Sequence, residues 1–302
     1  MIDGTWSRRD LLKRGAAAGG LLAVPGILVA CQRTQPGTGE SVQNTLDKIK
    51  EDGKVRIGFA NEGPYSYKDA NGELVGEAPA VHAEVFKALG VPELEPFLTD
   101  FGSLIPGLVA NRWDVVTAGM FILPDRCQQA LFSEPEYRGD SAFLVKEGNP
   151  KKITTYEDVA QKKATIGVLS GAVEADYAES AGASTSQLKT FESQQDGLEA
   201  VVAGRIDAFA LTSPSLKYTA ETNADAPVEV TKPFIPTVDG KPLPDYGGAA
   251  FRRRDTELRD AFNRELAKLR DSGRLLELIK PYGFTELNVP ESDVTTQQLC
   301  NR

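Results

Sequence analysis

The sequence predicts an α/β fold in two lobes. Strand-like segments alternate with helical segments of about ten residues, which is typical of βαβ units and of a mostly parallel sheet. This alternation occurs twice, with Gly148-Asn149-Pro150 between the two series, and 302 residues are enough for two domains. Ligands of such sheets bind beyond the carboxyl ends of the strands, so a site is expected at those positions.

The first series begins with residues 54–60, Lys-Val-Arg-Ile-Gly-Phe-Ala, which alternate as a half-buried strand. Asn71-Gly72 then predicts a tight hairpin. Apolar residues at helical spacing predict helices over residues 80–89 and 103–111. Further strands are predicted over residues 94–98, 114–118 and 141–146.

The second series is read in the same way. Its predicted strands are 163–168, 188–191 and 205–211. Its predicted helices are one that follows a turn at 169–172 and runs through 180, and two more at about 194–203 and at 213–222. A small-residue strand at 247–251 leads back to the first lobe, where helices are predicted over 256–271 and 273–280. The predicted lobes are therefore residues 45–143 with 247–302, and residues 144–246.

Composition excludes several classes of function. The net charge is −9, which argues against nucleic acid and against docking on anionic lipid. A single histidine, His82, and three cysteines make a zinc site or a Cys/His catalytic pair improbable, and we expect His82 at the surface. No phosphate-binding or dinucleotide-binding glycine motif is present, so no cofactor and no metal are predicted.

The amino terminus is predicted to be an export signal over residues 1–30. Arg8-Arg9 precedes an apolar run that is too short to span a bilayer. The ending Leu28-Val29-Ala30-Cys31 resembles the bacterial lipobox, which implies lipid attachment at Cys31; an unlipidated signal is the alternative. Residues 31–44 read as a flexible tether. The predicted location is outside the cytoplasm, anchored by lipid to the cell membrane.

Six residues that fall just after predicted strands are candidates for the site. An arginine can hold a carboxylate through two parallel hydrogen bonds, and an aromatic face attracts a cation. Arg126 and Phe121 lie five residues apart and suit a small ligand that has both features. The six candidates are Glu62, Tyr65, Phe121, Arg126, Gly171 and Thr212. The simpler interpretations are a surface arginine, a core phenylalanine and, for Thr212, a helix N-cap.

Several segments together resemble the extracellular solute-binding proteins of ABC importers, in the polar amino-acid branch. The resemblance covers roughly residues 45–287 and rests on segments that are specific only as a set. These are residues 55–58, 64–67, 101–108, Arg126 after Pro124, 204–208 and 250–263. The resemblance implies a two-lobed periplasmic-binding-protein fold of type II with a two-strand hinge. It also implies a monomer that binds a ligand, works with a membrane permease and is not an enzyme.

The sequence departs from this branch in a way that narrows the range of possible ligands. Thr212 stands where an aspartate usually pairs with the α-ammonium of an amino acid, and Gly171-Ala172-Val173 stands where Gly-Thr often meets the α-carboxylate. A buried ammonium without a partner is costly. The first lobe offers Glu62 and the rings of Tyr65, Phe101 and Phe121, a set that looks most like the ectoine/hydroxyectoine-binding proteins.

The resemblance then assigns roles to the first-lobe residues. Arg126 would clamp the carboxylate of ectoine, Glu62 would accept from its amidinium N–H groups, and the three rings would surround its ring. Gly171, Val173 and Thr212 are the predicted second-lobe contacts, and their roles stay undefined.

Three alternatives remain open. The ligand could be a polar amino acid, the chain could be a cyclohexadienyl dehydratase with Glu62 as general acid, or it could be a sensor module. If Cys31 is lipidated, Cys127 and Cys300 remain as an even pair, which suggests a disulfide outside the cell.

Overall fold

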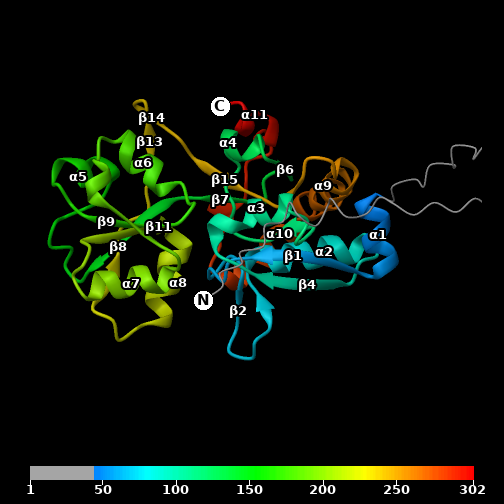
Figure 1. The fold of residues 1–302 in the computed structure, drawn as a ribbon, viewed down its shortest axis with the longest axis horizontal. Coiled ribbons are helices and arrows are strands. Elements are labelled where there is room, and N and C mark those ends of the chain that lie inside the picture. Colours follow the sequence, from blue (N-terminus) through cyan, green and yellow to red (C-terminus); the bar gives the residue numbers. More distant parts are fainter. Residues whose placement is uncertain (1–43) are drawn as a thin grey trace, which may run out of the picture. The chain divides into compact units, whose positions relative to one another are not determined.

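The computed structural model describes residues 44–302, which contain two five-stranded sheets. The predicted signal peptide, the lipidation site Cys31 and nearly all of the predicted tether lie outside these residues. None of the helices in the described part of the chain is both long and apolar enough to cross a bilayer. Figure 1 shows the two sheets as the centres of two lobes, joined by the strands β7 and β15.

The first sheet has the strand order β4-β1-β5-β16-β6. β1 pairs in parallel with β4 and β5, whereas β16 pairs antiparallel with β5 and β6. Val55, Ile57 and Phe59 of β1 are fully buried, as the alternation in the sequence predicted. The strand bounds are β1 (Lys54–Phe59), β4 (Glu93–Leu98), β5 (Val115–Val116), β6 (Ala130–Phe132) and β16 (Ala250–Arg252), with the hairpin β2 (Tyr67–Lys68) and β3 (Leu74–Val75) beside them.

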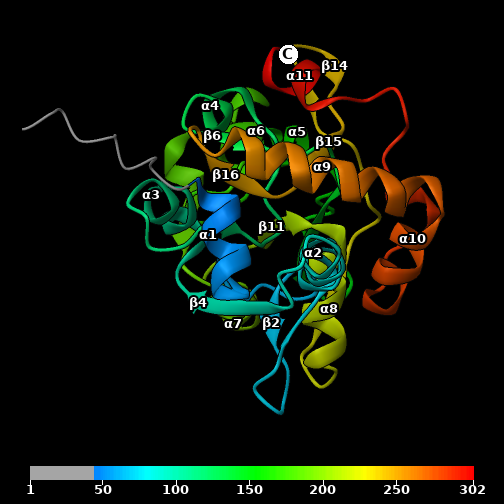
Figure 2. The ribbon, with the colours of Figure 1, turned by 90° about the vertical axis from the view of Figure 1, so that its right-hand side faces the viewer.

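Helices of this lobe bury their apolar faces against the sheet and against one another. Val81, Val85 and Phe86 of α2 are fully buried, and so are Phe262 and Leu266 of α9. Figure 2 views the lobe with α1, α2, α9 and α10 toward the reader. The bounds are α1 (Thr45–Asp52), α2 (Glu77–Ala88), α3 (Leu104–Val109), α4 (Pro124–Cys127), α9 (Thr256–Asp271), α10 (Arg274–Ile279) and α11 (Thr296–Cys300), with 3-10 turns at Phe101–Ser103, Lys280–Tyr282 and Glu286–Asn288.

The second sheet has the order β10-β9-β11-β8-β12, with β8 antiparallel to both β11 and β12. Its central strands are buried along their whole length, which explains their continuous apolar sequence. The bounds are β8 (Ser141–Lys146), β9 (Ile166–Leu169), β10 (Leu188–Phe191), β11 (Ala208–Thr212), β12 (Val228–Val230), α5 (Tyr156–Gln161), α6 (Glu174–Ser180), α7 (Gln194–Val202), α8 (Ser213–Thr222), a 3-10 turn (Thr185–Gln187) and the small pair β13 (Thr237–Val238) and β14 (Lys241–Pro242).

The two crossings between the lobes pair with each other. β7 (Tyr137–Gly139) lies antiparallel to β15 (Asp245–Gly247), so the connection is a two-stranded ribbon. β8 belongs wholly to the second sheet, because all of its residues from Ser141 to Val145 pair with β11. Sheet membership therefore places the first crossing at 137–139, a few residues before the predicted boundary at 143.

His82 is not at the surface, contrary to the expectation from sequence. It is 1% exposed and lies within hydrogen-bond distance of Thr117 Oγ1 and Glu136 Oε2, both at 2.9 Å. Glu136 in turn accepts from the backbone N–H of Ala249 at 2.8 Å. A lone histidine on a helix gives no sequence signal of this kind, because its partners come from distant segments. Among residues 44–302, no cluster of His, Cys, Asp or Glu could hold a metal ion.

A disulfide fastens the carboxyl-terminal helix α11 to α4. Cys127 and Cys300 are joined, with their Cα atoms 5.7 Å apart, and the bond closes a loop of 173 residues. The backbone N–H of Thr296 also donates to Glu134 Oε2 at 3.0 Å. The tail is therefore held at α4, which is the helix that carries Arg126.

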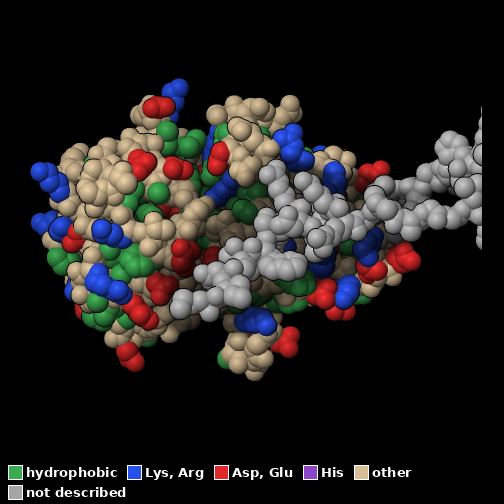
Figure 3. Space-filling view, in the orientation of Figure 1, with side chains coloured by type: hydrophobic (Ala, Val, Ile, Leu, Met, Phe, Trp, Pro, Cys, Tyr) green, Lys and Arg blue, Asp and Glu red, His purple; other side chains and the backbone are tan. Residues whose placement is uncertain are grey.

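Acidic and basic side chains are interspersed on the face that Figure 3 shows. The described residues of this face therefore create no strong field of one sign that would select a ligand by its charge. We expect ligand selection to depend on short-range contacts inside the protein.

We expect the double variant Cys127→Ser/Cys300→Ser to lose about 2–4 kcal/mol of unfolding free energy, because the unfolded chain gains freedom when a long loop is opened. Urea denaturation with and without reductant measures this. Reductant should lower the stability of the wild type and leave the double variant unchanged; a wild type indifferent to reductant would contradict the prediction.

Candidate functional site

Loops at the carboxyl ends of four strands enclose one cavity. Glu62 follows β1, Phe121 follows β5, Glu174 begins α6 after β9, and Thr212 ends β11. The wall consists of Glu62, Phe101, Gly119, Phe121, Arg126, Leu169, Ala172, Val173, Glu174, Leu211 and Thr212. The structure thus brings together six residues that the sequence singled out: Glu62, Phe101, Phe121, Arg126, Val173 and Thr212.

Arg126 is buried without a carboxylate partner. Its side chain donates to the carbonyl oxygen of Phe121 at 3.0 Å and to that of Gly171 at 3.0 Å. The guanidinium carbon lies 5.6 Å from the centre of the Phe101 ring. Within the described part of the chain, no acidic group lies within ion-pair distance of it, and burial lowers the pKa of Arg126. A cation held in this way is ready to accept an anionic ligand group.

Glu62 lies on the same cavity and is 6% exposed. Its Oε1 accepts a hydrogen bond of 2.6 Å from the hydroxyl of Ser215, on α8 of the other lobe. Burial raises the pKa of Glu62 to about 7, although Ser215 and Arg126 both act to lower it. Ser215 carries no signal in the sequence, because a serine in the first turn of a helix is common.

Glu174 is the charged residue that sequence reasoning missed. It is 2% exposed, it lines the cavity, and its Oε2 has no hydrogen-bond partner among the described residues. Burial raises the pKa of Glu174 to about 8, and repulsion from Glu62 and Asp245 adds to this effect. The signal that could have found it is its position, directly after the Gly171-Ala172-Val173 turn.

Two predicted residues, Tyr65 and Gly171, are not among those that line the cavity. Tyr65 is fully buried, and its ring packs 4.8 Å from that of Tyr137 and 5.3 Å from that of Phe284. It also supports the backbone of Gly119, where a Cβ would come within 2.6 Å of the ring. Tyr65 is thus a packing residue here and is not a wall of the cavity. Gly171 contributes its carbonyl oxygen to Arg126.

Thr212 caps α8, which is the simpler of its two predicted roles. Its side chain accepts from the backbone N–H of Ser215, the residue that donates to Glu62. The cap therefore helps to fix the start of the helix from which a second-lobe hydroxyl reaches the first lobe.

The two lobes meet closely around the cavity. Arg126 bonds to Gly171 and Ser215 bonds to Glu62, and both contacts cross from one lobe to the other. At Gly171, which has φ +74°, a Cβ would come within 2.6 Å of the Cα of Gly102. The enclosed space is about 10 Å³, roughly what one water needs. A larger ligand therefore requires the lobes to separate and to close again around it.

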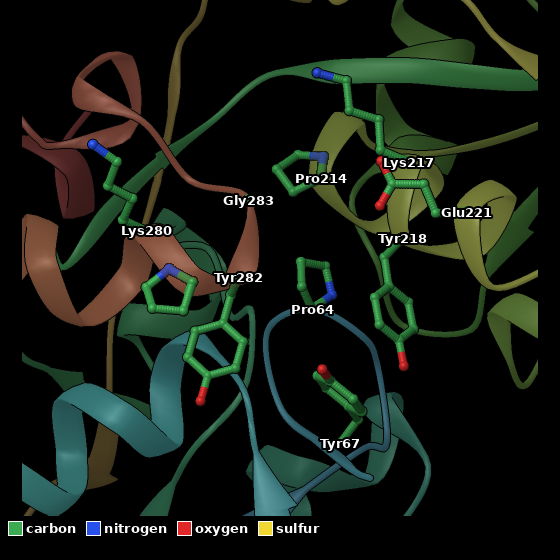
Figure 4. A pocket seen from close by; sticks show the side chains of 10 residues that line it. Pro64, Tyr67, Pro214, Lys217, Tyr218, Glu221, Lys280, Tyr282 and Gly283 are labelled. Carbon is green, nitrogen blue, oxygen red and sulfur yellow. The ribbon is translucent and has the colours of Figure 1, made fainter. Parts of the chain in front are cut away.

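A larger surface hollow of about 440 Å³ lies on the other side of the 62–67 loop. In Figure 4 the rings of Tyr67 and Tyr218 lie beside each other on its wall, with centres 4.8 Å apart, while the ammonium groups of Lys217 and Lys280 point away from these rings. Both lysines are exposed. Because no buried charge lines this hollow, the smaller cavity with Arg126 is the better candidate for ligand capture.

The raised pKa values predict a pH-dependent stability. Glu62 and Glu174 hold protons in the folded chain at pH values where the unfolded chain has lost them. The contribution of these two groups to folded stability is therefore fully present below the ordinary pKa near 4.5 and is lost as pH rises through about 7 to 8, by at most about 3 kcal/mol for Glu62. Thermal unfolding of ligand-free protein between pH 5 and 9 measures this. Glu62→Gln should flatten the decline, and parallel curves for both proteins would refute the assignment.

The sequence matches known proteins over most of its length. A probable amino-acid ABC transporter periplasmic-binding protein of Sinorhizobium fredii (strain NBRC 101917 / NGR234) is 37% identical over 265 residues, which are 85% of this chain and 86% of that protein. The lysine/arginine/ornithine-binding periplasmic protein of Escherichia coli (strain K12) is 30% identical over 230 residues, which are 76% of this chain and 86% of that protein.

Solved structures give the same result. EhuB in complex with hydroxyectoine is 38% identical, with a TM-score of 0.77, covering 85% of this chain and 98% of that one. The ancestral amino-acid-binding protein AncCDT-1, a precursor of cyclohexadienyl dehydratase, is 29% identical with a TM-score of 0.68, covering 79% of this chain and 99% of that one. These likenesses confirm the predicted type II binding-protein fold. Residues 55–286 match the family itself, so the chain belongs to the bacterial extracellular solute-binding proteins, family 3, as the substrate-binding component of an ABC importer for amino acids or related solutes.

Proposed function

We propose that this protein captures ectoine or hydroxyectoine between its two lobes and presents it to a membrane permease. Arg126 would clamp the ligand carboxylate, and Glu62 would accept from the amidinium N–H groups. The observation that carries the proposal is the burial of a guanidinium and a carboxylate in one ring-lined cavity. The likeness to a hydroxyectoine complex supports the same ligand class.

The aromatic wall of the site reduces to two rings. Phe101 and Phe121 line the cavity, and Tyr65 stands behind Gly119. Phe101 already lies beside the guanidinium of Arg126, so its first role is to hold that group in place. Phe121 is then the ring left to face the delocalised cation, a contact worth about 0.5–2 kcal/mol.

A basic amino acid is the second candidate. Two carboxylates and one guanidinium on the same cavity favour a ligand with one negative and two positive groups. The Escherichia coli relative is described as binding lysine, arginine and ornithine. Titration calorimetry with ectoine, hydroxyectoine, glutamine and arginine separates the two candidates, because heat from an amino acid alone would end the ectoine proposal.

Turnover is a weaker alternative. Glu62 has the raised pKa that a general acid needs, and one likeness is to a precursor of a dehydratase. The family, however, is one of solute-binding proteins, and we infer that the cavity serves binding. Release of product from prephenate or arogenate at high protein concentration would reverse this inference.

Arg126→Ala should weaken binding by at least a hundredfold, because the ligand carboxylate would be buried without a partner. Arg126→Lys should recover only part of the affinity, since an ammonium cannot form two parallel hydrogen bonds to one carboxylate. The exposed Arg205→Ala serves as the control and should bind as the wild type does. Equal affinity of Arg126→Ala and wild type in calorimetry would disprove the clamp.

A further inference from the structure

We propose that Glu174 is the second-lobe ligand-binding residue, and that with Glu62 it selects a ligand bearing two hydrogen-bond donors besides one carboxylate. The inference rests on the proposed function and deepens it. A cyclic amidinium zwitterion offers an N–H group on each side of its cation, and a hydroxylated one offers an O–H as well. A quaternary ammonium zwitterion offers neither.

Glu174 has an acceptor oxygen that is not used within the described part of the chain. Oε2 of Glu174 is buried, has no partner among the described residues and belongs to a side chain that lines the cavity. A buried polar atom without a hydrogen bond is costly. A hydrogen-bond donor of a ligand between the lobes would bond to Oε2 of Glu174. The free-energy cost of the missing hydrogen bond is therefore borne by the ligand-free closed form and is removed when the ligand binds.

Glu62 lines the same cavity as Glu174 but comes from the opposite lobe. Glu62 comes from the first lobe and Glu174 from the second, and Arg126 lines the same cavity. Oε1 of Glu62 is occupied by the Ser215 hydroxyl, which leaves Oε2 of Glu62 and Oε2 of Glu174 to accept from the ligand. Because the two acceptors belong to opposite lobes, the ligand needs a donor on each of two sides. Closure of the lobes would bring each acceptor into contact with one of these donors.

The rest of the second-lobe side of the cavity is largely apolar. Leu169, Ala172, Val173 and Leu211 are apolar, and the hydroxyl of Thr212 is used to cap α8. Of the described residues on this side of the cavity, Glu174 is the charged one. Glu174 thus supplies a polar group directly after the Gly171-Ala172-Val173 turn, where the Gly-Thr pattern is lacking.

Binding should also move protons. The charged groups that act on Glu174 are Glu62, Asp245 and Arg126, and the buried hydroxyls of Tyr65, Tyr156 and Tyr177 sense its charge. Burial, and to a smaller extent repulsion from Glu62 and Asp245, favours the protonated form of Glu174 in the closed, ligand-free protein. A cationic ligand reverses this preference, so binding releases protons near pH 7.

The test compares Glu174→Gln with Asp176→Asn, an equivalent change at an exposed residue of the same helix that does not line the cavity. With hydroxyectoine as the probe at pH 7, we expect Glu174→Gln to raise Kd at least tenfold and Asp176→Asn to change it less than twofold. Calorimetry in phosphate and in Tris, whose ionisation enthalpies differ, should show that the wild type releases more protons than Glu174→Gln. Glycine betaine should bind the wild type at least a hundredfold more weakly than hydroxyectoine.

The outcomes are distinguishable. Glu174→Gln removes a buried charge, so its ligand-free thermal midpoint at pH 8 should equal or exceed that of the wild type, which shows that it folds. If Glu174→Gln binds hydroxyectoine with a Kd within twofold of that of the wild type and releases as many protons, the proposed role of Glu174 is wrong. The proposed function is then unaffected. A wild type that binds neither ectoine nor hydroxyectoine at millimolar concentration overturns both.

Discussion

The burial of three charged groups around one small cavity is the constraint on which the site depends. Arg126, Glu62 and Glu174 are each less than one-tenth exposed, and their formal charges do not cancel. Such groups are stable only where hydrogen bonds or protons compensate for lost water. Backbone carbonyls compensate for Arg126, Ser215 for part of Glu62, and protonation for Glu174.

The groups that compensate for these buried charges come from both lobes, so the stability of the charges depends on whether the lobes are closed. The carbonyl of Gly171 and the hydroxyl of Ser215 reach first-lobe charges only when the lobes are together. A ligand that supplies a carboxylate and donor groups would replace these provisional partners. The free energy of closing then depends on how well the ligand matches the charges, and the β7–β15 ribbon allows the lobes to part without breaking either sheet.

Sequence reasoning predicted the fold well, because the signals it used are local. Alternation along residues 54–60 and helical periodicity along 256–271 follow directly from which face of each element is buried. The gathering of Glu62, Phe121 and Arg126 on one cavity could be predicted for the same reason, since the sequence places each of them after a strand. The short helices α1, α4, α5 and α11 were not predicted, because one or two turns leave too few residues for a periodic pattern.

What sequence could not show depends on contacts between distant segments. Tyr65 was predicted as a ligand contact or as a packing residue of its loop, and in the ligand-free protein its ring packs against Tyr137 and Phe284. His82 was predicted to be exposed, yet Glu136 and Thr117 bury it. Glu174 and Ser215 were overlooked because acids and serines in the first turn of a helix are common for reasons of capping and helix dipole alone.

The bond between Cys127 and Cys300 has a consequence for when the protein becomes competent. It covalently supports the short helix that carries Arg126, directly beside that residue. Thiols stay reduced in the compartment where the chain is synthesised, and they oxidise in the environments where this family works. The proposed anchor for a ligand carboxylate would therefore acquire its covalent brace only where thiols oxidise, and a reduced copy would be expected to hold a solute less firmly than an oxidised one.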